Sequence, residues 1–244
     1  MDDGIRLSAV LERPDIERCP LAIVLHGFTS SKDRPHTLAA CQAMREAGLA
    51  TLRFDLYGHG ESGGTFKEHT LYKWISNTLA VIDRARMLDF VTDIYLSGHS
   101  QGGLVAALAG GMALDLVKGL ILRAPAFMIP GCAREGSILG YAFDPVHIPD
   151  EINVINGMTL GGNYIRVAQT IHAEEAMERF PGPVLILHGD ADDVVPVEGS
   201  REAAERYRQC QLAVIPGETH HYDRFPEQMT RLIRDWLLVQ NNGG

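Results

Sequence analysis

Three features are scarce in this 244-residue sequence: paired cysteines, runs of basic residues and long apolar stretches. The four cysteines lie far apart and include no CxxC pair, which argues against a zinc site and against a disulfide framework. We therefore expect buried free thiols. The formal net charge is −9 and lysine and arginine form no cluster, so we expect no nucleic-acid partner and no anionic-membrane partner.

The apolar residues are spread through the chain. No stretch approaches the roughly 18 apolar residues that a membrane helix needs. The N-terminal segment MDDGIRLSAVLERP also lacks the basic-then-apolar pattern of a signal peptide. We expect a cytoplasmic protein with no membrane partner, and leave export by another route open. With 45% apolar and 22% charged residues, the chain has the composition of a globular domain with one large core.

Short apolar runs alternate with segments of helical spacing. The runs end in glycine, aspartate, histidine or proline, which is typical of buried parallel strands; they are 21–27, 49–55, 93–99, 117–125, 182–190 and 211–218. Helical spacing is found at 35–47, 72–89, 101–114, 197–208 and 226–240. This alternation predicts an α/β fold with a mostly parallel, doubly wound sheet, preceded by a hairpin-like N-terminal strand near residues 4–12.

One connection is far longer than the usual 2–6 residues between a strand and a helix. The run that ends at Arg123 is followed by a segment that contains several prolines and a helical pattern at 163–180 before the next run begins near Pro183. We interpret residues 125–181 as a lid inserted between the sixth and seventh strands. Residues 1–124 and 182–244 then form the two parts of the core. Because binding crevices lie at the carboxyl ends of parallel strands, the lid would cover a site.

The stretch Gly98-His99-Ser100-Gln101-Gly102 has the spacing G-x-S-x-G between a predicted strand and a predicted helix. A nucleophilic serine needs such a tight turn, with glycine on both sides because side chains there would collide with neighbouring backbone. The following helix directs its N-terminal amides at the reacting oxygen. The alternative is a serine that only caps the helix, a position where serine is favoured for reasons unrelated to catalysis.

A serine nucleophile requires a base and an acid that orients it, and both follow at the ends of later strands. Asp190, Asp192 and Asp193 follow one predicted strand, and His220 and His221 follow the last one. The chain order serine, aspartate, histidine is the order found in α/β-hydrolases. A solvated loop histidine is the alternative interpretation of the final motif.

An acyl-transfer site also needs two backbone N–H groups that bind the developing oxyanion. The sequence places them at Phe28, after the strand LAIVLHG, and at Gln101, directly after the serine. The glycine-rich stretch YGHGESGG at 57–64 lacks the lysine of a phosphate loop and is interpreted as a surface turn. The histidines show no metal-ligand spacing, in particular His59, His69, His147 and His172, so we predict no metal.

Six segments together resemble the bacterial cinnamoyl and feruloyl esterases of the α/β-hydrolase superfamily, over nearly the whole chain: LHGFTSSK, RFDLYGHGESGG, LSGHSQGG, FDPVHIPD, LGGNYIRVAQ and HGDADDVVP. HIPD and LGGNYIRVAQ, inside the expected lid, point to this narrower family. The resemblance implies Ser100 as nucleophile, Asp192 as orienting acid and His220 as base. Relatives commonly carry an acidic residue before that histidine, whereas this chain has Thr219, so His221 stays an alternative base.

The resemblance further implies that the lid forms an aromatic pocket, in which Tyr164 would bind the phenolic hydroxyl of the acid moiety. The alternative is that Tyr164 packs within the lid itself. The predicted function is that of a serine carboxylesterase that hydrolyses ferulate, p-coumarate or caffeate esters through an acyl-enzyme, with no cofactor. Its partner is a small aromatic ester; relatives are often dimers, so a homodimer is left open by analogy. Alternatives are a short-chain esterase, thioesterase or peptidase of this fold, or a non-catalytic binding protein.

Overall fold

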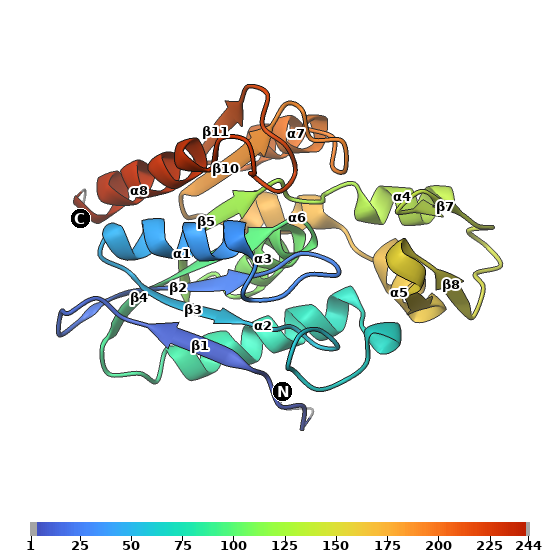
Figure 1. The fold of residues 1–244 in the computed structure, drawn as a ribbon, viewed down its shortest axis with the longest axis horizontal. Helices are drawn as coiled ribbons and strands as arrows, with labels where there is room; N and C mark the ends of the chain where they lie inside the picture. The colour runs from blue at the N-terminus through green and yellow to red at the C-terminus, as the bar shows by residue number, and fades with distance from the viewer. Residues whose placement is uncertain (1–3, 243–244) are drawn as a thin grey trace.

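The computed structural model describes residues 4–242, and its centre is a seven-stranded sheet (Figure 1). Only the first strand is antiparallel to its neighbour, so the predicted mostly parallel sheet of the α/β-hydrolase fold is confirmed. In spatial order the strands are β1 (Ala9–Glu12), β3 (Ala50–Phe54), β2 (Cys19–Leu25), β4 (Val91–His99), β5 (Val117–Arg123), β10 (Val184–Gly189) and β11 (Cys210–Ile215).

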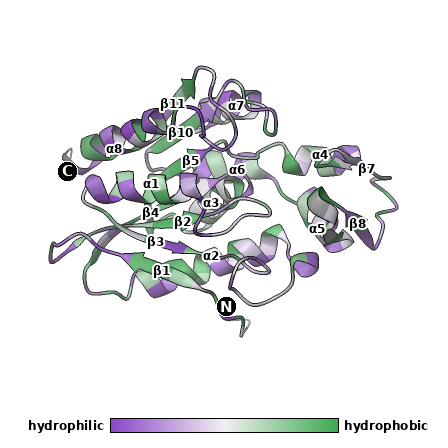
Figure 2. Cartoon of the chain, in the orientation of Figure 1, coloured by the Kyte–Doolittle hydropathy of each residue, from purple (hydrophilic) through white to green (hydrophobic). Residues whose placement is uncertain are grey.

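Helices cover both faces of this sheet, which explains why its central strands are continuous apolar runs rather than alternating ones. One face carries α1 (Pro35–Glu46) and α8 (Pro226–Asn242). The other carries α2 (Leu71–Ala85), α3 (Gln101–Met112), α6 (Ala173–Arg179) and α7 (Glu198–Arg206). In Figure 2, α1 and α8 show hydrophobic and hydrophilic colour in turn, as helices with one buried face do. Within residues 4–242, no helix has the length and apolar character needed to cross a bilayer.

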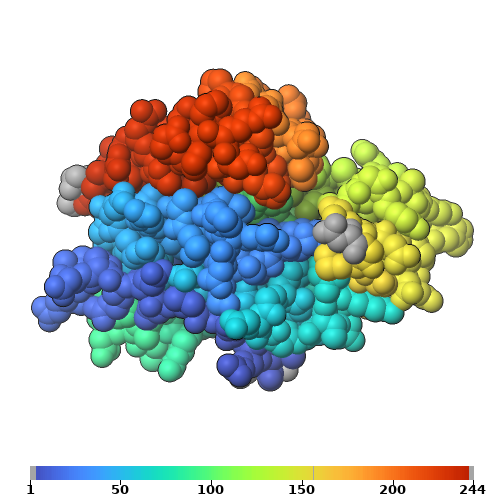
Figure 3. All heavy atoms as spheres, in the orientation of Figure 1, coloured from blue at the N-terminus to red at the C-terminus, as the bar shows by residue number. Residues whose placement is uncertain are grey.

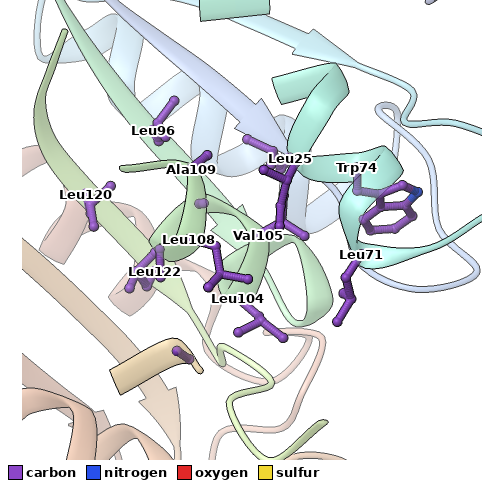
Figure 4. Packing of buried hydrophobic residues seen from close by; sticks show 14 of the residues in the cluster. Leu25, Leu71, Trp74, Leu96, Leu104, Val105, Leu108, Ala109, Leu120 and Leu122 are labelled. Atoms are coloured by element: carbon purple, nitrogen blue, oxygen red, sulfur yellow. The ribbon is translucent and has the colours of Figure 1, made fainter. Parts of the chain in front are cut away.

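Helix α3 is the central helix of its layer, and its sequence is apolar or glycine on nearly every side. Its leucines and valine lie among side chains of the sheet and of α2 (Figure 4). Small residues permit this close packing: a Cβ on Gly103 would lie 2.9 Å from Pro125, and one on Gly111 would lie 2.7 Å from Ala176 of α6. The serine motif is thus followed by a rigidly packed helix.

The predicted N-terminal strand is present as β1, but its pairing and the position of the insertion differ from the prediction. Residues 4–18 contribute a single strand, β1, which pairs with β3 and forms no hairpin with β2. The inserted segment therefore lies between the fifth and sixth strands of the main sheet, β5 and β10, rather than between the sixth and seventh. The structure has the four cysteines as free thiols. Cys19 and Cys41 are buried, as predicted, whereas Cys132 and Cys210 are only partly buried, contrary to the prediction.

The inserted segment forms a lobe at one side of the molecule (Figure 3). The helix expected over 163–180 is broken into α5 (Gly162–Gln169) and α6. Because α6 packs on α3, the last part of the segment belongs to the helical layer of the core, not to the lobe. The remaining elements are α4 (Ile129–Glu135), β6 (Ser137–Ile138), β7 (Tyr141–Ala142), β8 (Glu151–Asn153), β9 (Thr159–Gly161) and the short 3-10 helices Phe66–Glu68 and Ile155–Gly157.

Candidate active site

Ser100 lies in a strained turn between β4 and α3. Its φ of 56° and ψ of −124° lie outside the usual regions for a residue with a side chain. The two glycines of the motif are required by space: a Cβ on Gly98 would lie 2.1 Å from the Gly102 carbonyl oxygen, and one on Gly102 would lie 2.3 Å from the His26 carbonyl oxygen. Such strain persists only where the surrounding structure holds it, and it is typical of functional sites.

The structure brings His220, rather than His221, to Asp192. The Nδ1 atom of His220 lies 2.7 Å from Oδ2 of Asp192, and both side chains are almost fully buried. A carboxylate only accepts, so Nδ1 carries the proton and the lone pair of His220 is on Nε2. The ring of His221 lies instead 5.9 Å from that of His36 and is exposed.

The Asp192 carboxylate is held in its ionised form. Burial alone would raise its pKa, but hydrogen bonds from His188 and His220 outweigh burial and hold the pKa well below its usual range. The backbone amides of Val194 and Val195 donate to its Oδ1 atom at 2.9 and 2.8 Å. Asp190 accepts instead from the Gly217 amide, and Asp193 is exposed. Asp192 is thus the one carboxylate of this loop that contacts a histidine of the last loop.

Ser100 and His220 meet at one cavity of about 680 Å³, together with Gly27 and Phe28. Within residues 4–242 no hydrogen bond joins the Ser100 hydroxyl to His220, and in free enzymes this contact is often closed only by substrate. His99 connects the two motifs: its Nε2 atom donates to the His220 carbonyl oxygen at 2.8 Å. Nothing in the local sequence around His99 indicates this role.

The loop that carries His220 is also fixed by Glu218, a residue with no distinguishing signal in the sequence. Its carboxylate is fully buried and accepts hydrogen bonds from three backbone amides of the same loop. The donors are Thr219 at 2.7 Å, Arg224 at 3.2 Å and Phe225 at 2.7 Å. Glu218 therefore places a buried acidic group two residues before His220.

We expect Glu218→Gln to lower kcat on p-nitrophenyl acetate about 10- to 100-fold, because a small displacement of a catalytic group has effects of this size. In the variant, an amide NH₂ group replaces one acceptor oxygen and faces backbone N–H donors, so hydrogen bonds to that oxygen are lost. Each hydrogen bond to a charged group stabilises the folded protein by about 1.5–3 kcal/mol. Glu227→Gln, an exposed charge loss in the first turn of α8, is the matched control. Equal kcat values for the two variants would refute this role of Glu218.

The predicted oxyanion donors lie on either side of the Ser100 turn. Gln101 N is the first amide of α3, and Phe28 N belongs to the loop after β2. Among the described residues, neither amide donates to a backbone carbonyl of the surrounding turns and loops. His26 supports this loop from the interior: it pairs with the Gly27 carbonyl oxygen at 2.8 Å and accepts from the Leu56 amide at 3.0 Å. Burial lowers the pKa of His26 to about 3, so the ring stays neutral.

A buried ion pair anchors the far end of the Phe28 loop. Lys32 donates to Asp55 twice, from its backbone amide at 2.7 Å and from Nζ at 2.8 Å, and also donates to Glu61 at 2.7 Å. The Asp55 side chain is fully buried. Gly60 is required here, because its φ is +52° and a Cβ would lie 2.2 Å from the Asp55 carboxyl carbon. The stretch YGHGESGG thus closes over an ion pair rather than forming only a surface turn.

We expect Asp55→Asn to lower the free energy of unfolding by about 3 kcal/mol at pH 7, because it leaves the Lys32 ammonium buried without its main partner. Burial opposes ionisation of Asp55, but hydrogen bonds from Glu61 and Lys32 prevail and lower its pKa. A lowered pKa stabilises the fold above the unfolded value of about 4, and this contribution is lost as pH falls through the folded value. In urea unfolding, the difference in the free energy of unfolding between the wild type and Asp55→Asn should become smaller below about pH 4. A difference that does not change with pH would contradict the ion-pair explanation.

Tyr164, on α5, is placed directly behind the serine turn. Its hydroxyl donates to Gln101 Oε1 at 2.7 Å, and the residue is 1% exposed. Its ring lies 6.1 Å from Phe28 and 5.1 Å from His69. Burial raises its pKa, so the phenol stays neutral. The hydroxyl thus joins the inserted segment to the residue after the nucleophile, and its predicted contact with substrate remains a prediction.

Two protein families match this chain. The family described as serine aminopeptidase, S33 matches residues 17–142, and an uncharacterised protein family, UPF0227, matches residues 146–235. Among curated proteins, the monoacylglycerol lipase of Mycolicibacterium smegmatis is 24% identical over 96% of this chain and 94% of its own length. The human mitochondrial palmitoyl-protein thioesterase ABHD10 is 26% identical over 84% of this chain and 70% of its own length.

The solved structure of Est1E from Butyrivibrio proteoclasticus with ferulic acid bound is much more similar. It is 50% identical in sequence, the match covers 98% of this chain and 97% of Est1E, and the TM-score is 0.97. A second Est1E structure matches with 48% identity and a TM-score of 0.93. The likeness extends through the inserted segment, which the family model for residues 17–142 does not span.

Proposed function

This chain belongs to the bacterial cinnamoyl and feruloyl esterase family of the α/β-hydrolase superfamily, and we propose that it hydrolyses esters of hydroxycinnamic acids such as ferulate, p-coumarate and caffeate. That it is a serine ester hydrolase follows from the family and its esterase neighbours. The observation that carries the narrower proposal is the 50% identity, over nearly the whole of both chains, to a protein with ferulic acid bound.

In the first half of the proposed reaction, Ser100 Oγ attacks the ester carbonyl carbon while His220 Nε2 takes its proton. Asp192 keeps the proton of the neutral ring on Nδ1 and stabilises the charged ring that forms. The amides of Phe28 and Gln101 bind the developing oxyanion. His220 then gives its proton to the leaving oxygen, the alcohol departs and the acyl group remains on Ser100.

In the second half, water replaces the alcohol and the same residues act again. His220 takes a proton from water, the resulting hydroxide attacks the acyl carbon, and the proton passes to Ser100 Oγ as the acid is released. Overall one ester and one water give one acid and one alcohol. No step needs a group beyond the side chains and amides already named.

Aromatic side chains beside the predicted oxyanion donors support an aromatic acyl group. Phe28 contacts Phe66 edge to face, with ring centroids 5.2 Å apart, and lies 6.1 Å from the ring of Tyr164. Tyr164 comes from the inserted segment, in the stretch LGGNYIRVAQ. Aromatic pairs of this kind contribute about 0.5–1.5 kcal/mol of stabilisation in addition to the contribution from their buried area. Of these three rings, Phe28 lines the cavity beside Ser100, and the other two pack against it. The proposal therefore assigns the planar acid moiety of the substrate to the part of the cavity at Phe28.

The proposal is tested by steady-state hydrolysis of methyl ferulate and methyl butanoate, which share a leaving group. We expect kcat/KM to favour methyl ferulate at least tenfold, which corresponds to about 1.4 kcal/mol of transition-state preference. Hydrolysis of the butanoate alone would indicate a short-chain esterase. Preference for palmitoyl thioesters or monoacylglycerols would instead align the chain with its more distant relatives.

A further inference from the structure

The cavity beside Ser100 continues past His220 to the start of α1. Its wall there includes Arg34, His36, His221 and Asp223. In ester hydrolysis the catalytic histidine delivers a proton to the leaving oxygen, so the leaving alcohol must lie against the loop that carries His220. This part of the wall therefore faces the alcohol rather than the acyl group.

Arg34 supplies an unpaired positive charge on this wall. Its side chain is exposed, and no carboxylate within residues 4–242 forms an ion pair with it, whereas the nearby Lys32 and Arg53 both have carboxylate partners. Arg34 is close enough to influence His36 and His221 electrostatically. A guanidinium group is well suited to a carboxylate because its N–H groups match both oxygens.

His36 adds a hydrogen-bond donor. The residue is 8% exposed, and its Nδ1 atom lies 3.4 Å from Nη1 of the fully buried Arg123. A guanidinium group only donates, so Nδ1 of His36 is the acceptor and the ring proton is on Nε2. Within the described chain that N–H has no protein partner, although His36 lines the cavity. Burial lowers the pKa of His36 to about 2, so the ring stays neutral and presents this single donor.

The same contacts oppose a cation at this position. Nitrogen atoms of His36, His99 and His221 lie within 4.8 Å of one another, a spacing that invites a metal ion. Metal binding at His36 Nε2 would move its proton to Nδ1, directly against the Arg123 guanidinium. Two guanidinium groups also repel a cation here. Asp223 is the one acid on this wall, and its carboxylate already accepts from the Thr219 hydroxyl.

We propose that this wall is a subsite for the leaving alcohol and that it selects alcohols bearing a carboxylate, that is hydroxy acids, through Arg34 and the Nε2–H group of His36. The inference rests on the proposed ester hydrolysis and adds to it the chemistry of the alcohol. The ester oxygen lies at His220, and the carboxylate of the same alcohol binds Arg34. The negative charge of Asp223 repels the carboxylate of such an alcohol and so weakens this selection.

The test compares glycolic acid esters with their own methyl esters, which differ by one negative charge. Each alcohol is supplied with two acyl groups, feruloyl and acetyl, and kcat/KM is measured for all four compounds. We expect the wild type to favour the free acid about tenfold in both acyl series. Arg34→Gln should bring the ratio of acid to methyl ester close to one, and Asp223→Asn should raise it.

Arg231→Gln is the matched control, because Arg231 is exposed on α8 and forms no ion pair among the described residues, yet its loss changes the net charge equally. It should keep the wild-type ratio. A wild-type ratio of one or less in both series, or an unchanged ratio in Arg34→Gln, overturns the subsite. Acid preference in the acetyl series without cleavage of feruloyl esters supports the subsite and refutes hydroxycinnamoyl hydrolysis. Cleavage of methyl ferulate with no preference for the free acid refutes the subsite and supports hydroxycinnamoyl hydrolysis.

Discussion

Replacement of Ser100 by alanine should lower kcat/KM by about 10⁴- to 10⁶-fold, the range set by serine hydrolases that lose their nucleophile. Without Oγ no acyl-enzyme forms, and only the oxyanion amides and substrate binding remain to accelerate attack by water. The loss should appear in kcat on every ester tested. The turn itself should persist, because Gly98 and Gly102 rather than the serine hydroxyl make the room for it.

Ser97→Ala is the matched control for this variant. Ser97 lies three residues earlier in β4, is fully buried, and its hydroxyl has no hydrogen-bond partner in the described part of the chain. Its loss should leave kcat within a fewfold of the wild type. If Ser100→Ala retained more than a hundredth of the wild-type rate, a different residue would have to be the nucleophile.

The second large effect is expected for Asp192→Asn, with a loss in kcat of about 10⁴-fold near neutral pH. Asparagine keeps the shape of the side chain but offers an amide that stabilises the wrong tautomer of His220. The positive charge that develops on the imidazole ring also loses its counter-charge. Because hydrogen bonds hold the pKa of Asp192 far below neutral, the wild type keeps this carboxylate ionised across the working range of the enzyme.

The neighbouring carboxylate provides the control. Asp193→Asn removes an exposed charge from the same loop, next to Asp192, and should change kcat by less than about threefold. Esterase assays on p-nitrophenyl acetate from pH 5 to 9 compare the two variants with the wild type. A comparable loss in both variants would mean that the loop charge, and not the contact between Asp192 and His220, supports catalysis.

Sequence predicts a part of the site where the local backbone conformation or burial allows only a few residue types at a position. The turn at Ser100 needs glycine at positions 98 and 102 because carbonyl oxygens lie where Cβ atoms would be. The strands β2, β4 and β5 are buried on both faces, which leaves continuous apolar runs in the sequence. The main sheet and the approximate positions of its flanking helices followed from these signals.

The rest depends on contacts between segments that are distant in sequence or on loop geometry. Glu218 could not be distinguished from a solvated loop acid until the structure showed three amides around its carboxylate. The pair of Lys32 and Asp55 joins residues 23 positions apart. Tyr164 and Gln101 are 63 positions apart, and the buried hydrogen bond between them has no local sequence signal. Sequence motifs therefore predict candidate reacting groups, whereas the residues that position these groups emerge from the structure.

The most direct test of hydroxycinnamoyl hydrolysis through Ser100 is to trap the acyl-enzyme. The protein is mixed rapidly with excess p-nitrophenyl ferulate, quenched in acid at successive times and digested, and the peptide that contains Ser100 is examined by mass spectrometry. We predict that this peptide gains the mass of one feruloyl group during the first turnover and that Ser100→Ala shows no such gain. Release of p-nitrophenol with Ser100 unmodified at every quench time, or a feruloyl group on another residue, would contradict the mechanism.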